Sequence, residues 1–104
     1  MVDKKLTTPL NHKNFLAKKI FENIGEIIDG SIAYIDINGG GPQPAHTHPH
    51  NHFFIVLEGE IKICLNNEEI VLKKDQSLLV KGSISHSVWN NKKEQAKVLG
   101  INIK

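Results

Sequence analysis

Four of the six histidines in this sequence fall within seven consecutive residues, as His46, His48, His50 and His52. In an extended chain, side chains an even number of residues apart point to the same face, so His46, His48 and His52 can share one face. The apolar run Phe53–Leu57 follows directly. Imidazoles that enter an apolar interior need a partner there, and a transition metal suits them. The tract therefore predicts a metal site, with a solvated loop as the alternative.

A further histidine, His86, lies downstream in an expected strand, where Val88 shares its face. A lone histidine on a strand is more often a core residue with satisfied hydrogen bonds than a metal ligand. Because His86 accompanies the upstream tract, it is a candidate fourth ligand. His50 could lie beside these ligands, but we expect it at an exposed turn.

The elements that must position these histidines are expected to be short β-strands. Apolar and polar residues alternate with a period of two from Ser31 onward, which is typical of strands. Glu58-Gly59 and Asn66-Asn67 have the composition of hairpin turns. Short strands at this spacing, without a convincing long helix, predict an antiparallel sandwich or barrel. The expected strands are residues 32–37, 55–57, 61–65, 68–73, 77–80, 84–90 and 96–103.

The N-terminal part of the chain has a weaker pattern. Residues 1–14 are polar, so we expect an arm there. Residues 15–22 fit a short helical face or a strand, and we favour a strand over Lys19–Glu22 because strands follow it. Asp29-Gly30 is expected to be a turn. The predicted organisation is one domain, with an arm and edge strand over residues 1–30 and a barrel over residues 31–104.

Length and composition narrow the class of protein. A chain of 104 residues with 39% hydrophobic and 23% charged residues fits one ordinary globular domain. The net charge of +2, with lysine and glutamate interspersed, argues against nucleic acid as a partner. Cys64 is the single cysteine, so no internal disulfide and no oxidising compartment is implied. No apolar stretch is long enough to span a membrane and no signal-peptide pattern is present, so we expect a cytoplasmic protein without a membrane partner.

The histidine spacing resembles the two sequence motifs of the cupin family. The first motif reads G-x5-H-x-H-x3,4-E-x6-G, and it is matched at Gly40, His46, His48, position 52 and Gly59. The second reads G-x5-P-x-G-x2-H-x3-N, and it is matched at His86 and Asn90. The departures are His52 in place of the glutamate of the first motif, and Asp75, Lys81 and Ser83 in place of the glycine, proline and glycine of the second. The resemblance spans about residues 31–103.

This resemblance implies an all-β fold, a cupin-type antiparallel β-barrel of the double-stranded β-helix or jelly-roll kind. In the family, three histidines and a glutamate hold a divalent metal ion inside the barrel. Carried over to this sequence, the ligands are His46, His48 and His86, with His52 where the glutamate would be, as in four-histidine members. The alternative is that His52 marks a site that has lost its metal. The ion is expected to be a divalent transition metal, whether Mn, Fe, Zn, Ni, Co or Cu.

Two functions are compatible with such a site. One is a metal-dependent oxygenase or isomerase that acts on a small organic anion, because four neutral imidazoles leave the charge of the ion uncompensated. The other is a non-catalytic module that holds a metal or small ligand for sensing or storage, and the sequence leaves this choice open. The expected partners are a small-molecule ligand or substrate and a second copy, in a homodimer formed through a strand edge or sheet face. The residues expected to line a pocket are Gln43, Phe54, Tyr34, Val56 and Val88.

Overall fold

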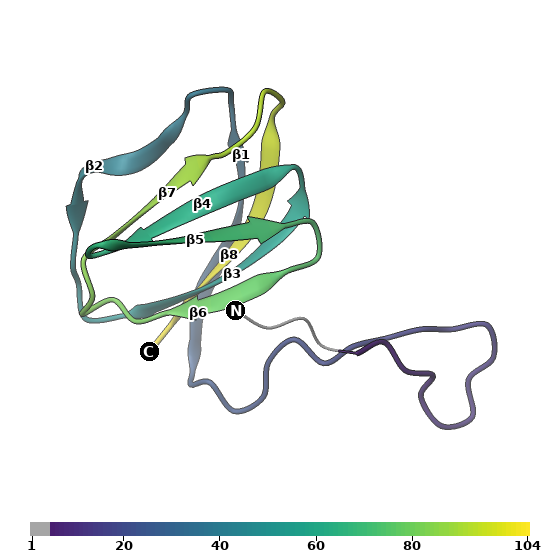
Figure 1. Ribbon diagram of the computed structural model, residues 1–104. Helices are drawn as coiled ribbons and strands as arrows, with labels where there is room; N and C mark the ends of the chain where they lie inside the picture. Colours follow the sequence, from purple (N-terminus) through teal and green to yellow (C-terminus); the bar gives the residue numbers. More distant parts are fainter. Residues whose placement is uncertain (1–4) are drawn as a thin grey trace.

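The computed structural model describes residues 5–104, which form eight β-strands and no helix (Figure 1). The all-β prediction, which rested on the period-two alternation, is confirmed. Among the described residues, no helix exists that could cross a membrane. The strands are β1 (Ile27–Ile35), β2 (Gly40–His46), β3 (Asn51–Glu58), β4 (Glu60–Leu65), β5 (Glu68–Lys73), β6 (Ser77–Val80), β7 (His86–Asn90) and β8 (Ala96–Ile103).

The strands pair into two four-stranded antiparallel sheets. The first sheet has the order β1-β8-β3-β6, and the second has the order β2-β7-β4-β5. In the view of Figure 1, β4, β5 and β7 lie in front of β1, β3 and β8. Consecutive strands therefore change sheet repeatedly, which brings residues distant in the sequence to the space between the sheets. This arrangement is a two-sheet jelly roll.

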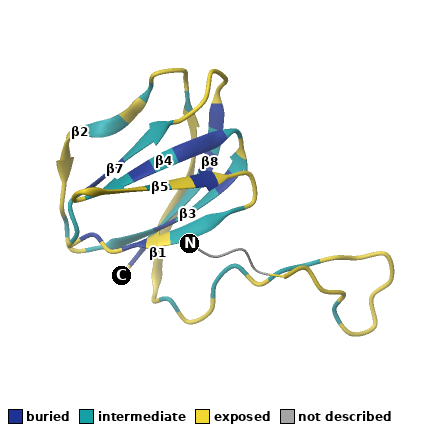
Figure 2. Cartoon of the chain, viewed as in Figure 1, coloured by how far each residue is buried: buried dark blue, intermediate teal, exposed yellow. Residues whose placement is uncertain are grey.

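The core lies between the two sheets because alternate side chains of each strand point inward. Val56 on β3, Ile61 and Ile63 on β4, and Leu72 on β5 are completely buried. Each such side chain stabilises the fold by about 1.5–3 kcal/mol through removal from water. Figure 2 shows buried segments on strands of both sheets, among them β4 and β8.

Two local expectations for the N-terminal part are wrong. Residues 19–22 form no strand; instead the Phe21 ring packs edge-on against the Phe53 ring on β3, with 5.1 Å between the ring centroids. Asp29-Gly30 is not a turn but lies inside β1, which begins at Ile27. The pairing of β1 with β8 shifts register between Ile27 and Asp29, so this strand accommodates the Asp-Gly pair through an irregularity rather than by ending.

Strands β2 and β1 each lie at an edge of a sheet. β2 is an edge strand of the second sheet, which suits its Pro42 and Pro44 because proline cannot donate a ladder hydrogen bond. β1 is an edge strand of the first sheet. The described part of the N-terminal arm extends away from the sheets and is closed on itself by an isolated bridge between Thr7 and Ala17 (Figure 1).

Candidate metal centre

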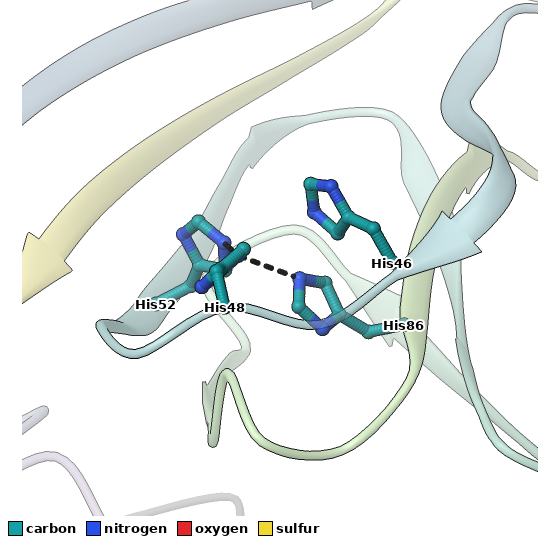
Figure 3. A group of neighbouring side chains, drawn as sticks. All are labelled: His46, His48, His52 and His86. Atoms are coloured by element: carbon teal, nitrogen blue, oxygen red, sulfur yellow. Dashed lines mark hydrogen bonds between the residues drawn. The ribbon is translucent and has the colours of Figure 1, made fainter.

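The two sheets bring together the four histidines that the sequence singled out. His46 at the end of β2 and His86 at the start of β7 lie opposite each other on neighbouring strands of the second sheet. His52 lies on β3 of the first sheet. His48 lies in the loop between β2 and β3. One ring nitrogen from each histidine lies within 4.8 Å of the others. Figure 3 shows the four rings gathered around one space.

The outward-facing nitrogens of two of these rings are fixed by backbone carbonyls. The Nδ1 atom of His48 lies 2.8 Å from the carbonyl oxygen of His50, and the Nδ1 atom of His86 lies 2.7 Å from that of Ile84. A carbonyl oxygen can only accept, so both Nδ1 atoms must carry the hydrogen. In the neutral ring, the Nε2 atoms of His48 and His86 are therefore left with a free lone pair.

The ring of His52 is fixed by a row of side chains that crosses three strands. Asn102 lies opposite His52 in the β3–β8 pairing, and Asp29 lies opposite Asn102 in the β1–β8 pairing. The Nδ2 atom of Asn102 donates to the Oδ1 atom of Asp29 at 2.7 Å, so the amide presents its oxygen to His52. That oxygen accepts from the Nδ1 atom of His52, also at 2.7 Å. The Nε2 atom of His52 therefore has a free lone pair as well.

The three free lone pairs face one another. The Nε2 atom of His48 lies 2.8 Å from that of His52 and 3.1 Å from that of His86 (Figure 3). Two lone pairs cannot form a hydrogen bond with each other, so three such nitrogens at this spacing fit a cation that binds them all. A metal cation would suit this position, and the outward contacts are of the kind that orient metal-binding imidazoles.

Burial keeps two of the rings neutral. It lowers the pKa of His52 from 6.5 to about 4; the hydrogen bond to Asn102 opposes this shift, and the neighbouring His48 and His86 add to it. Burial likewise lowers the pKa of His86, against the opposing hydrogen bond to the carbonyl of Ile84. Neutral imidazole is the form that binds a metal, so both rings are in the ligating state at neutral pH.

Gly82 and Asn51 hold the loop that carries His48. The backbone N–H of His48 donates to the carbonyl of Gly82 at 2.9 Å, and the backbone N–H of Gly82 donates to the Oδ1 atom of Asn51 at 3.0 Å. A Cβ atom at position 82 would lie 2.6 Å from the Nδ1 atom of His48 and closer still to the carbonyl oxygens of His48 and His50. Only glycine fits there without displacing the loop.

His50 contributes to the site through both its ring and its backbone. Its ring stacks on that of His48, with 3.9 Å between the centroids, and its carbonyl accepts from the same ring. It is not among the four residues whose ring nitrogens converge. His50 thus lies beside the cluster and is half-buried, where an exposed turn was expected.

A cavity of about 630 Å³ adjoins the cluster, and His46, His52 and His86 contribute to its wall. Of the residues predicted to line a pocket, Phe54, Tyr34 and Val88 are part of this wall. Val56 and Gln43 are not: Val56 is completely buried in the core, and Gln43 is exposed on β2. The remaining wall comes from β1, the turn into β2, the first residues of β2, and β8.

Sequence reasoning missed Asn102, Asp29, Asn51 and Gly82. The alternation of β8 places Asn102 on the same face as Val98 and Gly100, which was the one available signal for it. No local pattern marked the other three, because each acts through a partner distant in the sequence.

Comparison with known proteins identifies the fold. The family model for the cupin domain matches residues 33–102, more than half of the chain. No curated protein matches the sequence significantly.

Solved structures with the same fold share little sequence with this chain. A cupin 2 conserved barrel domain protein from Salinispora arenicola has a TM-score of 0.65 at 15% identity, and the match covers 72% of this chain and 61% of that one. A predicted oxalate decarboxylase from Thermotoga maritima has a TM-score of 0.67 at 16% identity, covering 75% and 67%. A sugar phosphate isomerase from Silicibacter pomeroyi has a TM-score of 0.64 at 15% identity, covering 72% and 49%. The chain thus spans less than two thirds of the first and third of these proteins.

Proposed function

Because the chain belongs to the cupin family, we propose that His46, His48, His52 and His86 hold one divalent transition metal ion. The family and the jelly-roll fold that the sequence resemblance implied are confirmed. The observation that carries the proposal is the convergence of the Nε2 atoms of His48, His52 and His86, each left with a lone pair because its Nδ1 atom faces an acceptor. His46 completes the set, its ring centroid 4.7 Å from those of His48 and His86.

The reaction that best fits this centre is a metal-dependent oxygenase reaction on a small organic anion, with an isomerase reaction as the second possibility. The metal, when bound, would supply Lewis acidity and, for a redox-active ion, electron transfer with dioxygen. The chain's own residues would hold the metal through four imidazoles, present an apolar wall to the body of the substrate and leave the ion's charge to the substrate.

The lack of a suitable proton acceptor favours the oxygenase over the isomerase. An isomerase needs a general base within reach of the substrate. Within residues 5–104, Asp36 is the one carboxylate in the cavity wall; it is exposed, and its Oδ1 atom already accepts a hydrogen bond from Gln95 at 2.7 Å. The proteins of similar fold include a predicted oxalate decarboxylase and a sugar phosphate isomerase, so this fold carries more than one type of reaction.

Oxygen consumption decides between an oxygenase and a non-catalytic binding module, and product analysis of the same mixtures detects isomerisation, which consumes no oxygen. The metal-loaded protein is assayed with dicarbonyls, catechol-like compounds and keto acids. We expect consumption with at least one class, abolished in His48→Ala and unchanged in His12→Ala, which removes an exposed histidine of the arm. Metal binding without turnover of any compound would favour the module for sensing or storage.

The proposal includes a homodimer in the cytoplasm. Leu10 and Leu16 of the arm are 86% and 67% exposed, and Ile32 and Tyr34 of the edge strand β1 are 50% and 60% exposed. Apolar surface of this extent on an arm and a sheet edge is typical of a subunit contact. Sedimentation velocity should show a dimer, and a monomer at high protein concentration would contradict this part of the proposal.

A further inference from the structure

The cavity beside the histidines is apolar over most of its wall. Phe54 comes from β3, Val88 from β7 and Val98 from β8, while Ala33 and Ile35 come from β1. A Cβ atom at Gly100 would lie 3.5 Å from the Phe54 ring, so the absent side chain leaves usable space there. A volume of about 630 Å³ is in the range of ordinary small-molecule sites. The wall therefore suits the apolar body of a compact ligand.

The same wall carries almost no charge. With the histidines neutral, Asp36 is the one formally charged residue among the described residues that line it. The sequence contains 13 basic residues, all of them lysines, and none of those within residues 5–104 lines the cavity. A negative group on the ligand could therefore meet positive charge at the histidine end, from the metal. Elsewhere, Lys97 places its ammonium over the ring of the wall residue Tyr34, 5.6 Å from the centroid. A second negative group packed against Phe54, Val88 or Val98 would lose its hydration there without a cation to pair with.

We propose that this cavity binds a small molecule with an apolar body and a single anionic head, and that it discriminates against dianions such as dicarboxylates and phosphate monoesters. The head lies at the histidine end, and the body packs against Phe54, Val88 and Val98. This inference rests on the proposed metal site, because the metal would supply the charge that the head requires. The inference narrows the proposed class of ligand from small organic anions in general to monoanions with an apolar body.

A matched pair of 2-oxo acids tests this selectivity. 4-Methyl-2-oxopentanoate and 2-oxoglutarate share the same head, but the first ends in a branched alkyl group and the second in another carboxylate. Each is titrated calorimetrically into protein loaded with Zn²⁺, which is redox-inert, so the readout is binding rather than turnover. We expect the branched monoanion to bind at least about tenfold more tightly, the scale of one lost charge-assisted contact.

Two lysine variants sharpen the test. Ala33→Lys adds a cation to the cavity wall, whereas Val71→Lys adds the same charge at an exposed position of β5 that does not line it. The Ala33→Lys variant should bind 2-oxoglutarate at least about tenfold more tightly than the parent protein does, and Val71→Lys should leave both affinities unchanged.

The outcomes separate this inference from the proposed function. Zinc stoichiometry is measured first, and protein that binds no metal would overturn both. Protein that binds zinc but prefers 2-oxoglutarate, or binds neither acid, would overturn the inference and leave the metal site standing. An equal gain in 2-oxoglutarate affinity in both lysine variants would also contradict it, because the effect would then come from net charge rather than from the wall.

Discussion

Asn102 lies directly opposite His52 in the pairing of β8 with β3, and its Oδ1 atom is 2.7 Å from the Nδ1 atom of the imidazole. Asp29, one strand further along the same row, holds the amide in the orientation that makes this contact possible. The register of three neighbouring strands thus sets the tautomer of one ring. That ring stands where the family motif has a glutamate, and the row of side chains fixes the position of its lone pair.

Replacement of Asn102 by leucine should weaken metal binding. Leucine cannot accept the Nδ1–H of His52, so the ring loses both its orientation and its preferred tautomer. Loss of such an outer contact typically costs about 10–100-fold in metal affinity. Competition with a chromogenic chelator measures the effect. Asn67→Leu, in the exposed turn between β4 and β5, is the control, and equal zinc affinity in the two variants would show that the row has no such role.

Gly82→Ala should damage the site through the loop that carries His48. The added Cβ atom overlaps the carbonyls of His48 and His50, so the loop must shift. We expect a loss of about 1–3 kcal/mol in the free energy of unfolding, as for other overpacked sites, together with weaker zinc binding. Gly30→Ala is the matched control, since a Cβ atom there would approach nothing closer than 3.5 Å. A Gly82→Ala protein with the stability and zinc affinity of Gly30→Ala would contradict this account.

The metal-free protein should lose stability as the pH falls. In the unfolded chain His52 takes up a proton near its ordinary pKa of 6.5, whereas in the folded protein it does so only near a pKa of about 4. Between these values the unfolded state binds more protons, so stability is fully present above about pH 6.5 and declines toward pH 4. The lowered pKa of His86 acts in the same direction.

Thermal unfolding of the metal-free protein at a series of pH values measures this dependence. The transition temperature should fall from about pH 7 to pH 5, before most carboxylates titrate. A His52→Gln variant removes the largest contributor and should show a shallower fall over the same range. A transition temperature that stays constant or rises on acidification would be incompatible with a buried, neutral His52.

His50→Ala should have a smaller effect than the loss of a ligand. The contact that orients His48 comes from the backbone carbonyl of residue 50, which alanine retains. The variant loses only the ring that stacks on His48. Zinc affinity should therefore fall by less than about tenfold, the lower end of the range for lost outer contacts, while His48→Ala should abolish high-affinity binding. Comparable losses in the two variants would make His50 a ligand in its own right.

The fold and the four histidines were accessible from the sequence because their signals are local. Alternation of apolar and polar residues has the period of a strand, and the spacing of His46, His48 and position 52 falls within one short segment. The convergence of His86 on them follows from the same motif resemblance. Each of these inferences needed only neighbouring residues or a known pattern.

The residues that orient the site were not accessible, because cross-strand register is set by the whole sheet. Asp29 was read as part of a turn since Asp-Gly is a local turn signal, yet it lies within β1 opposite Asn102. Similarly, alternation indicates that Val56 points inward, but it cannot distinguish the solid core, where Val56 lies, from the cavity that Phe54 reaches. Whether an inward-pointing side chain lies in the solid core or in the cavity wall depends on how the second sheet packs against the first.

The position of bound metal in an anomalous difference map tests the central claim most directly. Crystals should be grown from protein purified without a nickel column and supplied with Mn, Fe, Zn, Ni, Co or Cu. We predict a single strong peak about 2.0–2.2 Å from a ring nitrogen of each of His46, His48, His52 and His86. A map without a peak at this cluster, or with its peak elsewhere on the protein, would contradict the account.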